Sequence, residues 1–302
     1  MSTAAGTGPI LFVGLGSMGA PMASRLAAAG HEVLLHDVDG DRARALAGRT
    51  GARAVDTLAA SAPTVAVAVL MLPDSTAVET VLLGERGLLA TLGPGAVVVD
   101  MGSSRPGSSV QLAATAAGRG IGWLDAPVSG GVTRAGDGSL AVMVGGEQAV
   151  LDRVRPVLAV LGSDVTLVGS AGSGHAMKAL NNLLSAIGLV AASEVLSVGS
   201  NFGLDPQVML DVLNRSTGRN HATEVKMARF VLSRSFDSGF PLDLMVKDLR
   251  TAVDLAHETA TPVPLAASCL EEWAAASRSL PSSADHTQVA AYVESRAGTR
   301  LQ

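Results

Sequence analysis

A glycine-rich turn near the start of the chain constrains the fold more than any other feature of the sequence. It follows the short apolar run 10–13 and has the pattern Gly-x-Gly-x-x-Gly: Gly14, Leu15, Gly16, Ser17, Met18 and Gly19. We expect a helix at 18–29 and a second strand at 33–36, with Asp37 directly after that strand. A strand, a tight turn, a helix and a second strand that ends at a carboxylate are typical of a dinucleotide-binding βαβ unit.

Each glycine of the turn has a physical reason. Gly14 permits the tight turn, Gly16 leaves room for a pyrophosphate beside the backbone, and Gly19 lets the helix pack closely on the strand. The N-terminus of the helix adds unpaired N–H groups and a positive dipole, which attract phosphates. The turn therefore predicts a nucleotide cofactor as well as a fold.

Asp37 is placed to accept hydrogen bonds from the ribose hydroxyls of the adenine nucleotide, and its charge would repel a 2′-phosphate. This favours NAD over NADP, while Arg42 and Arg44 a few residues later leave NADP possible. The chain has 34 glycines, so the bare motif is weak by itself, and a strand–turn–helix unit without a nucleotide is the alternative. The surrounding strand and helix pattern favours the cofactor site.

Composition sets the class of protein. A chain of 302 residues with 48% hydrophobic and 16% charged residues can bury a large core and is expected to form two domains. The net charge of −5 and the aromatic content of 3% argue against a nucleic-acid partner. The single cysteine, Cys269, excludes an internal disulfide and fits a reducing compartment.

Localisation is expected to be cytoplasmic. The first nine residues have neither the basic start nor the long apolar core of a secretory signal. The longest apolar helical segment, 176–199, is interrupted by polar residues, so we interpret it as a core helix and predict no membrane partner.

The pattern of the chain changes near residue 170. Before that point short apolar runs alternate with Ala-rich helical stretches, with strands expected at 10–13, 33–36, 65–70, 96–100, 122–124, 140–144 and 165–168. After it, helical segments follow one another at 176–199, 206–214, 221–232, 242–258, 264–279 and 285–297. We predict an α/β fold in which residues 1–170 form a Rossmann-type, doubly wound sheet domain and residues 171–302 an all-α domain for substrate binding and dimerisation.

A lysine in an apolar helix is the main candidate for catalysis. Lys178 and Asn182 are four residues apart, so on a helix they share a face. The helix that follows is apolar on nearly every side and carries Glu194 as its one charge. Burial makes an ammonium group lose its proton more easily, which is the property of a general acid/base. The alternative is a lysine that extends to solvent near the start of a helix.

Two further segments carry polar groups that suit a ligand. Ser129, Gly130 and Gly131 come directly after a strand and would expose a hydroxyl and backbone N–H groups to a carboxylate, although an ordinary Pro/Gly turn explains the same residues. The pair Lys247-Asp248 lies on an amphipathic helix and by spacing alone is a solvated face.

We predict no metal site, because the histidines are dispersed and the acidic residues do not cluster. His31, His36, His175 and His221 are interpreted as structural or surface groups. A serine hydrolase is excluded because no Gly-x-Ser-x-Gly lies on a strand-to-helix turn.

Taken together, four ordered motifs resemble the β-hydroxyacid dehydrogenase family, which includes 3-hydroxyisobutyrate dehydrogenase and tartronate semialdehyde reductase. The resemblance runs from about residue 10 to about residue 290, and its motifs are segments 14–23, 125–131, 172–182 and 247–249. It implies a Rossmann-type N-terminal domain, a helical C-terminal domain and an active site between them. It also implies a nicotinamide cofactor, a small hydroxy acid or semialdehyde as substrate, and a homodimer or homotetramer.

The resemblance assigns roles residue by residue. Lys178 would be the catalytic acid/base and Asn182 would orient the substrate, while the Ser129, Gly130 and Gly131 loop would bind its carboxylate. On the cofactor side the family pattern points to Leu72, Pro73, Ser103 and Lys247, the last of which reaches the cofactor and closes the site in relatives.

Three positions depart from the family pattern. Ala77 stands where relatives have asparagine, and Gly102 stands where serine is frequent, so each removes a polar contact to cofactor or substrate. Arg219 lies in a segment that differs from the Gly-x-Ser-Trp pattern of some members, and is either a substrate contact or a solvated loop residue. Two alternatives to a dehydrogenase stay open: a cofactor-bound scaffold without catalysis, and an imine reductase on the same fold.

Overall fold

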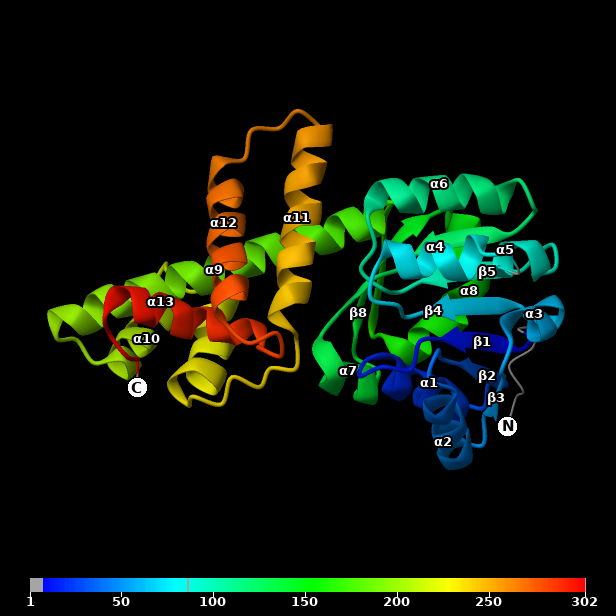
Figure 1. Ribbon diagram of the computed structural model, residues 1–302, viewed down its shortest axis with the longest axis horizontal. Helices are drawn as coiled ribbons and strands as arrows, with labels where there is room; N and C mark the ends of the chain where they lie inside the picture. The colour runs from blue at the N-terminus through cyan, green and yellow to red at the C-terminus, as the bar shows by residue number, and fades with distance from the viewer. Residues whose placement is uncertain (1–7, 86, 302) are drawn as a thin grey trace. The chain divides into compact units, whose positions relative to one another are not determined.

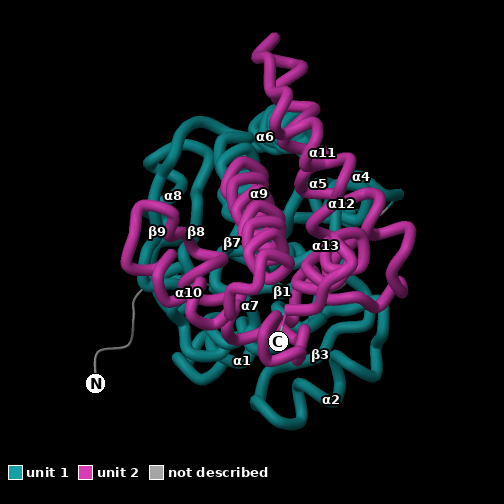
Figure 2. The backbone as a smooth tube through the Cα atoms, turned by 90° about the vertical axis from the view of Figure 1, so that its left-hand side faces the viewer, with its two compact units in different colours: residues 1–178 teal, residues 179–302 magenta. Residues whose placement is uncertain are grey.

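The computed structural model describes residues 8–85 and 87–301. Most of the first nine residues, which lack the sequence features of a secretory signal, therefore lie outside the described residues. The chain divides into two compact units, residues 1–178 and residues 179–302 (Figure 2). Each unit has a hydrophobic core of its own, and each is described here by itself.

A nine-stranded sheet forms the centre of the first unit. Its strands are β1 (Ile10–Val13), β2 (Val33–His36), β3 (Arg53–Ala54), β4 (Val67–Leu70), β5 (Val97–Asp100), β6 (Gly122–Asp125), β7 (Val128–Ser129), β8 (Ala141–Gly146) and β9 (Asp164–Gly169). Their order is β3-β2-β1-β4-β5-β6-β8-β7, and β9 pairs with β8. Strands β1 to β6 are parallel, so their carboxyl ends share one edge of the sheet.

Helices cover both faces of this sheet (Figure 1). They are α1 (Gly19–Ala28), α2 (Gly40–Thr50), α3 (Leu58–Ser61), the 3₁₀ helix η1 (Ala62–Thr64), α4 (Ser75–Leu83), α5 (Leu88–Thr91), α6 (Pro106–Ala117), α7 (Gly131–Asp137) and α8 (Gln148–Leu161). In β1, Ile10 and Phe12 pack with α1, α2 and α8, whereas Leu11 and Val13 pack with α4, α5 and α6. Alternate side chains thus face opposite layers, as the period of a strand requires.

The predicted doubly wound α/β fold is confirmed, with one correction at the edge of the sheet. Strand β8 runs antiparallel to β6 and to β7, whereas the sequence pattern predicted parallel strands. Between β6 and β8 the chain makes only the two-residue strand β7 and the short helix α7. A parallel pair would require a helix that crosses over the sheet between the two strands, and the chain instead reverses direction there.

The second unit is helical. Its first element is the carboxyl-terminal part of α9 (Ser173–Phe202), followed by α10 (Pro206–Asn214), the π-helix η2 (Ala222–Leu232), α11 (Leu242–Glu258), α12 (Pro264–Ser279), the 3₁₀ helix η3 (His286–Gln288) and α13 (Val289–Ala297). Leu242, Met245, Val246 and Leu249 of α11 form the buried stripe that their spacing predicts. They pack around Trp273 of α12, which is fully buried.

Helix α9 is long and apolar enough, by length and composition, to cross a membrane. Its residues Ala186, Leu189 and Leu196 are buried in the core of the helical unit. A helix with one side in a protein core passes the same test, so the finding is weak evidence for a membrane span. The helix is not buried all round, however, because Leu184 and Phe202 are exposed.

Candidate active site

The carboxyl ends of the parallel strands bring the glycine turn and its predicted partners together. Gly14 follows β1 with a φ of +94°, and a Cβ there would collide with the carbonyl group of Met71, which follows β4. A Cβ at Gly19 would collide with the carbonyl oxygen of Gly14, because the start of α1 lies directly against the turn. Both positions therefore require glycine.

Gly16 lies in open space, since a Cβ built there would meet no atom within 4 Å. The turn thus has an accessible backbone at its centre and close packing on either side. This combination fits a dinucleotide pyrophosphate, which needs a backbone that it can approach at the N-terminus of a helix.

Asp37 lies beside this turn. Its carboxylate accepts hydrogen bonds from the backbone N–H of Leu15 at 2.7 Å and of Asp39 at 2.9 Å, and Arg42 lies 3.3 Å away. Burial raises the pKa of Asp37, but the two N–H groups and Arg42 together lower it below its usual value. Asp37 is therefore ionised at neutral pH and ties the end of β2 to the turn after β1.

Leu72 lies between two glycines at the same edge of the sheet. The Cδ2 atom of Leu72 would be 3.1 Å from a Cβ at Gly14, and its carbonyl oxygen 2.5 Å from a Cβ at Gly102. This explains one departure from the family pattern, because a serine at residue 102 would not fit against Leu72 in this backbone. Ser103 follows in the same loop and is half-buried, and Pro73 follows Leu72.

Ala77, a second departure from the family pattern, occupies the first turn of α4. Its backbone N–H donates to the side chain of Asp74, which caps that helix, at 2.9 Å. The methyl side chain of Ala77 offers no hydrogen bond in return. The position therefore lacks the polar side chain that the family pattern implies there.

In the helical unit, Asn182 is held by Asp248. The Asn182 Nδ2 atom donates to the Asp248 Oδ2 atom at 2.6 Å, and its Oδ1 atom accepts from Asn181 at 3.2 Å. The Nζ atom of Lys247 lies 3.4 Å from the Asp248 Oδ1 atom. The structure thus brings together two predicted site residues, Asn182 and Lys247, through Asp248, which the sequence analysis did not assign to the site.

Asp248 was interpreted as part of a solvated face, and this is wrong, because the residue is 2% exposed. The signal that could have placed it was present in the sequence. It lies three residues after Met245 and four before Ala252, both buried, and this spacing puts it on the apolar side of α11.

Lys178 lies one helical turn before Asn182 on α9, on the same face of that helix. The sequence analysis predicted a lysine without a solvated face, whereas the structure leaves Lys178 half-buried. Part of the apolar surface of α9 is exposed. The apolar composition of this helix therefore predicted more burial than the structure shows.

The Ser129 loop contains two consecutive glycines in a backbone conformation that favours glycine. Gly130 and Gly131 have positive φ angles of +136° and +70°, and both are exposed. Ser129 is half-buried at the end of β7, where it pairs with Ala141 of β8. Arg219, by contrast, is an exposed residue of the loop after α10.

Sequence reasoning missed a second polar group, which lies under this edge of the sheet. Asp100 and Asp125 end two adjacent strands, and His175 of α9 lies beside them; all three are buried. The signal was that each aspartate closes an apolar strand, but which side chains meet there depends on the fold.

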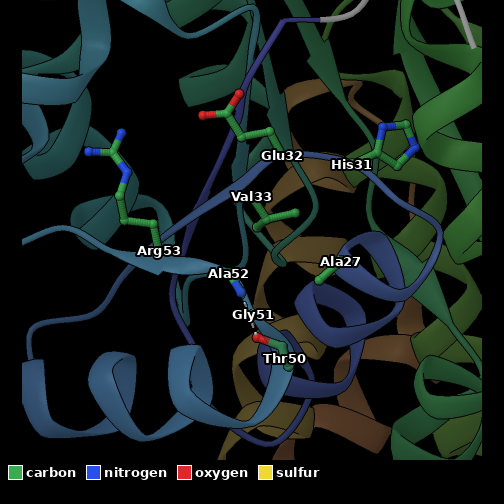
Figure 3. A pocket seen from close by; sticks show the side chains of 8 residues that line it. All are labelled: Ala27, His31, Glu32, Val33, Thr50, Gly51, Ala52 and Arg53. Atoms are coloured by element: carbon green, nitrogen blue, oxygen red, sulfur yellow. Dashed lines mark hydrogen bonds between the residues drawn. The ribbon is translucent and has the colours of Figure 1, made fainter. Parts of the chain in front are cut away.

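A hollow of about 200 Å³ opens at the opposite edge of the sheet (Figure 3). It is lined by residues that precede β2 and β3, among them His31, Glu32 and Ala52. The hydroxyl group of Thr50 in its wall donates to Leu46 and accepts from Ala52. The candidate site lies at the carboxyl ends of the strands, so this hollow is not part of it.

Two family models cover almost the entire chain. The NAD binding domain of 6-phosphogluconate dehydrogenase matches residues 9–169, and the NAD-binding domain of NADP-dependent 3-hydroxyisobutyrate dehydrogenase matches residues 172–293. The chain is 39% identical to 2-(hydroxymethyl)glutarate dehydrogenase of Eubacterium barkeri over 256 residues, 85% of each chain. It is 36% identical to 2-hydroxy-3-oxopropionate reductase of Escherichia coli, with 96% of this chain and 98% of that protein covered.

Solved structures agree with these relatives. A Mycobacterium tuberculosis 3-hydroxyisobutyrate dehydrogenase with L-serine has a TM-score of 0.88 and 30% identity, and covers 95% of this chain and 99% of its own. Psf3 in complex with NADP+ and 2-OPP has a TM-score of 0.82 and 30% identity, with 94% and 99% covered. An imine reductase of Streptomyces aurantiacus is more distant, with a TM-score of 0.62 and 20% identity over 94% and 99%, and shows the fold alone. The chain therefore belongs to the β-hydroxyacid dehydrogenase family of NAD(P)-dependent oxidoreductases.

Proposed function

We propose that this protein oxidises a small β-hydroxy acid, or reduces the corresponding semialdehyde, with Lys178 as the general acid/base. The observation that carries the proposal is the fixed amide of Asn182, which Asp248 holds at 2.6 Å one helical turn from Lys178. A lysine and an oriented amide on one helix face suit a proton transfer to or from an oxygen atom. When bound, the nicotinamide cofactor supplies the hydride acceptor or donor.

The proton balance assigns a role to each side chain. In oxidation, the neutral amine of Lys178 takes the proton of the substrate hydroxyl group as the C–H bond breaks. In reduction, the ammonium of Lys178 returns that proton to the carbonyl oxygen. The second N–H of the Asn182 amide holds the same oxygen in line, because Asp248 takes the first.

The Ser129 hydroxyl group and the backbone N–H groups of Gly130 and Gly131 would bind the substrate carboxylate. The exposure of both glycines supports this role, since neither has a side chain that would keep an anion from its backbone. An anchored carboxylate fixes which face of the carbinol carbon is presented, and positioning of this kind contributes as much as proton transfer.

We propose NAD as the preferred cofactor, held by the turn from Gly14 to Gly19 with Leu15, Gly16, Ser17 and Met18. Asp37 supports this choice, because its ionised carboxylate would repel a 2′-phosphate. Arg42 beside Asp37 keeps NADP possible. Leu72, Pro73, Ser103 and Lys247 would complete the cofactor contacts.

The protein is proposed to work as a homodimer or homotetramer in the cytoplasm. Leu184, Val195, Val198 and Phe202 are exposed apolar residues on one face of α9. Their spacing places them on a continuous strip, which we call the α9 stripe. An apolar strip of this length on a helix supports an interface with a second copy.

A cofactor-oxidation assay tests the proposed function. The purified protein is mixed with NADH or NADPH and a panel of three- and four-carbon semialdehydes, and absorbance of the reduced cofactor is followed. We expect turnover with at least one semialdehyde that carries a carboxylate, and none with the matching aldehyde that lacks it. Tight NADH binding without turnover across the panel would favour a cofactor-bound scaffold and overturn the proposal.

A further inference from the structure

The first turn of α9 is surrounded by buried polar side chains that the proposed chemistry does not use. Asp100 and Asp125 are register partners at the ends of β5 and β6, and each is 0% exposed. His175, which is 1% exposed, reaches them from α9. Burying a charge costs free energy unless hydrogen bonds compensate it. The hydrogen bonds of these three side chains therefore indicate which part of the structure they stabilise.

Asp125 caps α9 from a neighbouring strand. Its Oδ1 atom accepts the backbone N–H of Gly172 at 2.7 Å, and its Oδ2 atom accepts that of His175 at 3.0 Å. The first N–H groups of a helix have no partner within the helix, and a negative charge there also interacts favourably with the helix dipole. One carboxylate therefore fixes both the entry of the chain and the first turn of α9.

The ring of His175 is hydrogen-bonded to α6 and lies close to the end of β5. Its Nδ1 atom is 2.7 Å from the hydroxyl oxygen of Ser109 on α6, and its Nε2 atom is 3.7 Å from Asp100 Oδ2. Asp100 is itself fixed by the N–H of Gly102 at 3.0 Å and the hydroxyl group of Ser104 at 2.7 Å. Burial raises the pKa of Asp125, although His175 and the two capping N–H groups act in the opposite direction.

The backbone of α9 is seated directly on the sheet at the same place. A Cβ at Gly174 would lie 2.5 Å from the carbonyl oxygens of Asp125 and of Met143. A Cβ at Gly145 of β8 would lie 2.7 Å from the N atom of Gly174. The backbone of α9 thus approaches β6 and β8 with no side chain between them. Even a small displacement of α9 toward the sheet would cause a steric clash.

These contacts lie one turn from Lys178. Lys178 follows Gly174 by four residues and His175 by three, so its side chain leaves α9 on the side that is seated on the sheet. Within the described part of the chain no group of three His, Cys, Asp or Glu side chains is arranged to hold a metal ion. The geometry of the buried polar group instead serves the start of the helix.

We propose that Asp125, His175 and Ser109 are positioning residues for Lys178, because they fix the height and rotation of the first turn of α9. The inference rests on the proposed function, which gives Lys178 the proton transfer. A displacement of about 1 Å at a reacting group can lower turnover by about 10²-fold. An asparagine at residue 125 would leave one acceptor oxygen for two capped N–H groups and place an NH2 group against the other, which would produce a displacement of that kind.

The chemical reactivity of the Lys178 amine can be measured against internal references, because the chain contains three lysines: Lys178, Lys226 and Lys247. Trace reductive methylation of the intact NADH-bound protein, followed by peptide mapping, gives the rate at Lys178 relative to the other two. In Asp125→Asn we expect this relative rate to change by about threefold or more and kcat to fall by about 10- to 100-fold, with the Kd for NADH within about twofold.

The control is Asp285→Asn, which removes a half-buried capping carboxylate from the helical unit. It should lower the Tm comparably and leave the rate at Lys178 relative to Lys247 unchanged. Lys226 does not serve as the reference in this variant, because it interacts with His286 beside Asp285. If Asp125→Asn does not fold, Ser109→Ala replaces it, since the loss of one hydroxyl hydrogen bond costs only about 1 kcal/mol; we expect the same direction of change.

A variant with a lower Tm but the wild-type relative rate at Lys178 would overturn the inference, because the group would then be structural only. This outcome is distinct from failure of the proposed function. Full turnover in Lys178→Ala would remove the role of Lys178 in chemistry, whereas the methylation rate would still report whether Asp125 sets its position.

Discussion

Asp37 combines two tasks in one side chain. It holds the glycine turn through the N–H of Leu15, and in the proposed cofactor site its negative charge, partly balanced by Arg42, would repel a 2′-phosphate. The pKa of Asp37 is lowered by these partners, so the charge persists throughout the neutral range. Cofactor preference should therefore depend on this one carboxylate more than on any neighbouring charge.

The substitution Asp37→Ser removes that charge and leaves Arg42 in place. We expect the ratio of kcat/KM for NADPH to that for NADH to rise by about tenfold or more, which corresponds to about 1.4 kcal/mol. Asp39→Asn is the matched control, because Asp39 also lies near Arg42, at 3.5 Å, but is half exposed. An equal shift in both variants, or none in either, would show that Asp37 does not set the preference.

Candidate site residues were easier to name from the sequence than the hydrogen-bond partners of those residues. The spacing of Lys178 and Asn182 was visible in the sequence because four residues make one helical turn. The partner of Asn182 lies 66 residues away on α11, and that of His175 lies on α6, also 66 residues away. Contacts at such separations depend on the packing of elements, which spacing along the chain does not contain.

At the scale of elements, capping residues explain which boundaries the sequence predicted. Helix α10 begins at Pro206 as expected, since Asp205 accepts the N–H of Val208 and proline fits the first helical position. Strand β3 and helix α7 were missed, because two strand residues and a seven-residue helix carry too little periodicity. The segment of the π-helix η2 was predicted as an ordinary helix.

The two kinds of glycine in helices give opposite predictions for stability. Gly48 of α2 lies in open space, so Gly48→Ala should raise the free energy of unfolding by roughly 0.5–1 kcal/mol. Gly19→Ala should lower it by about 2 kcal/mol or more, because its Cβ would collide with the carbonyl group of Gly14. Urea unfolding measures both changes, and similar effects at the two positions would contradict the packing described for the turn.

Asp285 makes the start of η3 sensitive to acid. It accepts N–H groups from Gly239 at 2.8 Å and Thr287 at 2.9 Å, and thereby ties the segment before α11 to the last helices. Burial raises the pKa of Asp285, but the hydrogen bonds from His286 and Thr287 lower it well below its usual range. A lowered pKa means that ionised Asp285 stabilises the fold above the unfolded pKa of about 3.9 and that this stability is lost as the pH falls.

We therefore expect Asp285→Asn to lower the Tm by several degrees at pH 7, and the difference from the wild type to shrink as the pH falls below 4. Calorimetry from pH 7 to pH 3 measures the difference in Tm between the variant and the wild type. Asp137→Asn is the control, since Asp137 is an exposed residue that pairs with Ser139 and should have little effect at either pH. A difference that stays constant down to pH 3 would contradict the assignment.

For the whole molecule, the α9 stripe predicts association. Light scattering should give a mass of two or four times the 30.4 kDa of one chain. A double variant, Val198→Asp with Phe202→Asp, should be monomeric, because it places two charges on the apolar strip. Leu265→Asp, on an exposed position of α12 outside the strip, should leave the mass unchanged. A monomeric wild-type protein would leave the stripe without this role.

The proposed role of Lys178 is tested by the turnover of Lys178 variants with the best semialdehyde found for the wild type. Lys178→Ala removes the proton carrier, and Lys178→Arg keeps the positive charge in a group that does not release its proton at neutral pH. We predict that kcat falls by about 10²–10⁴-fold in both variants while the Kd for NADH changes by less than about twofold. Turnover close to that of the wild type in either variant would contradict the assignment of Lys178 as the acid/base.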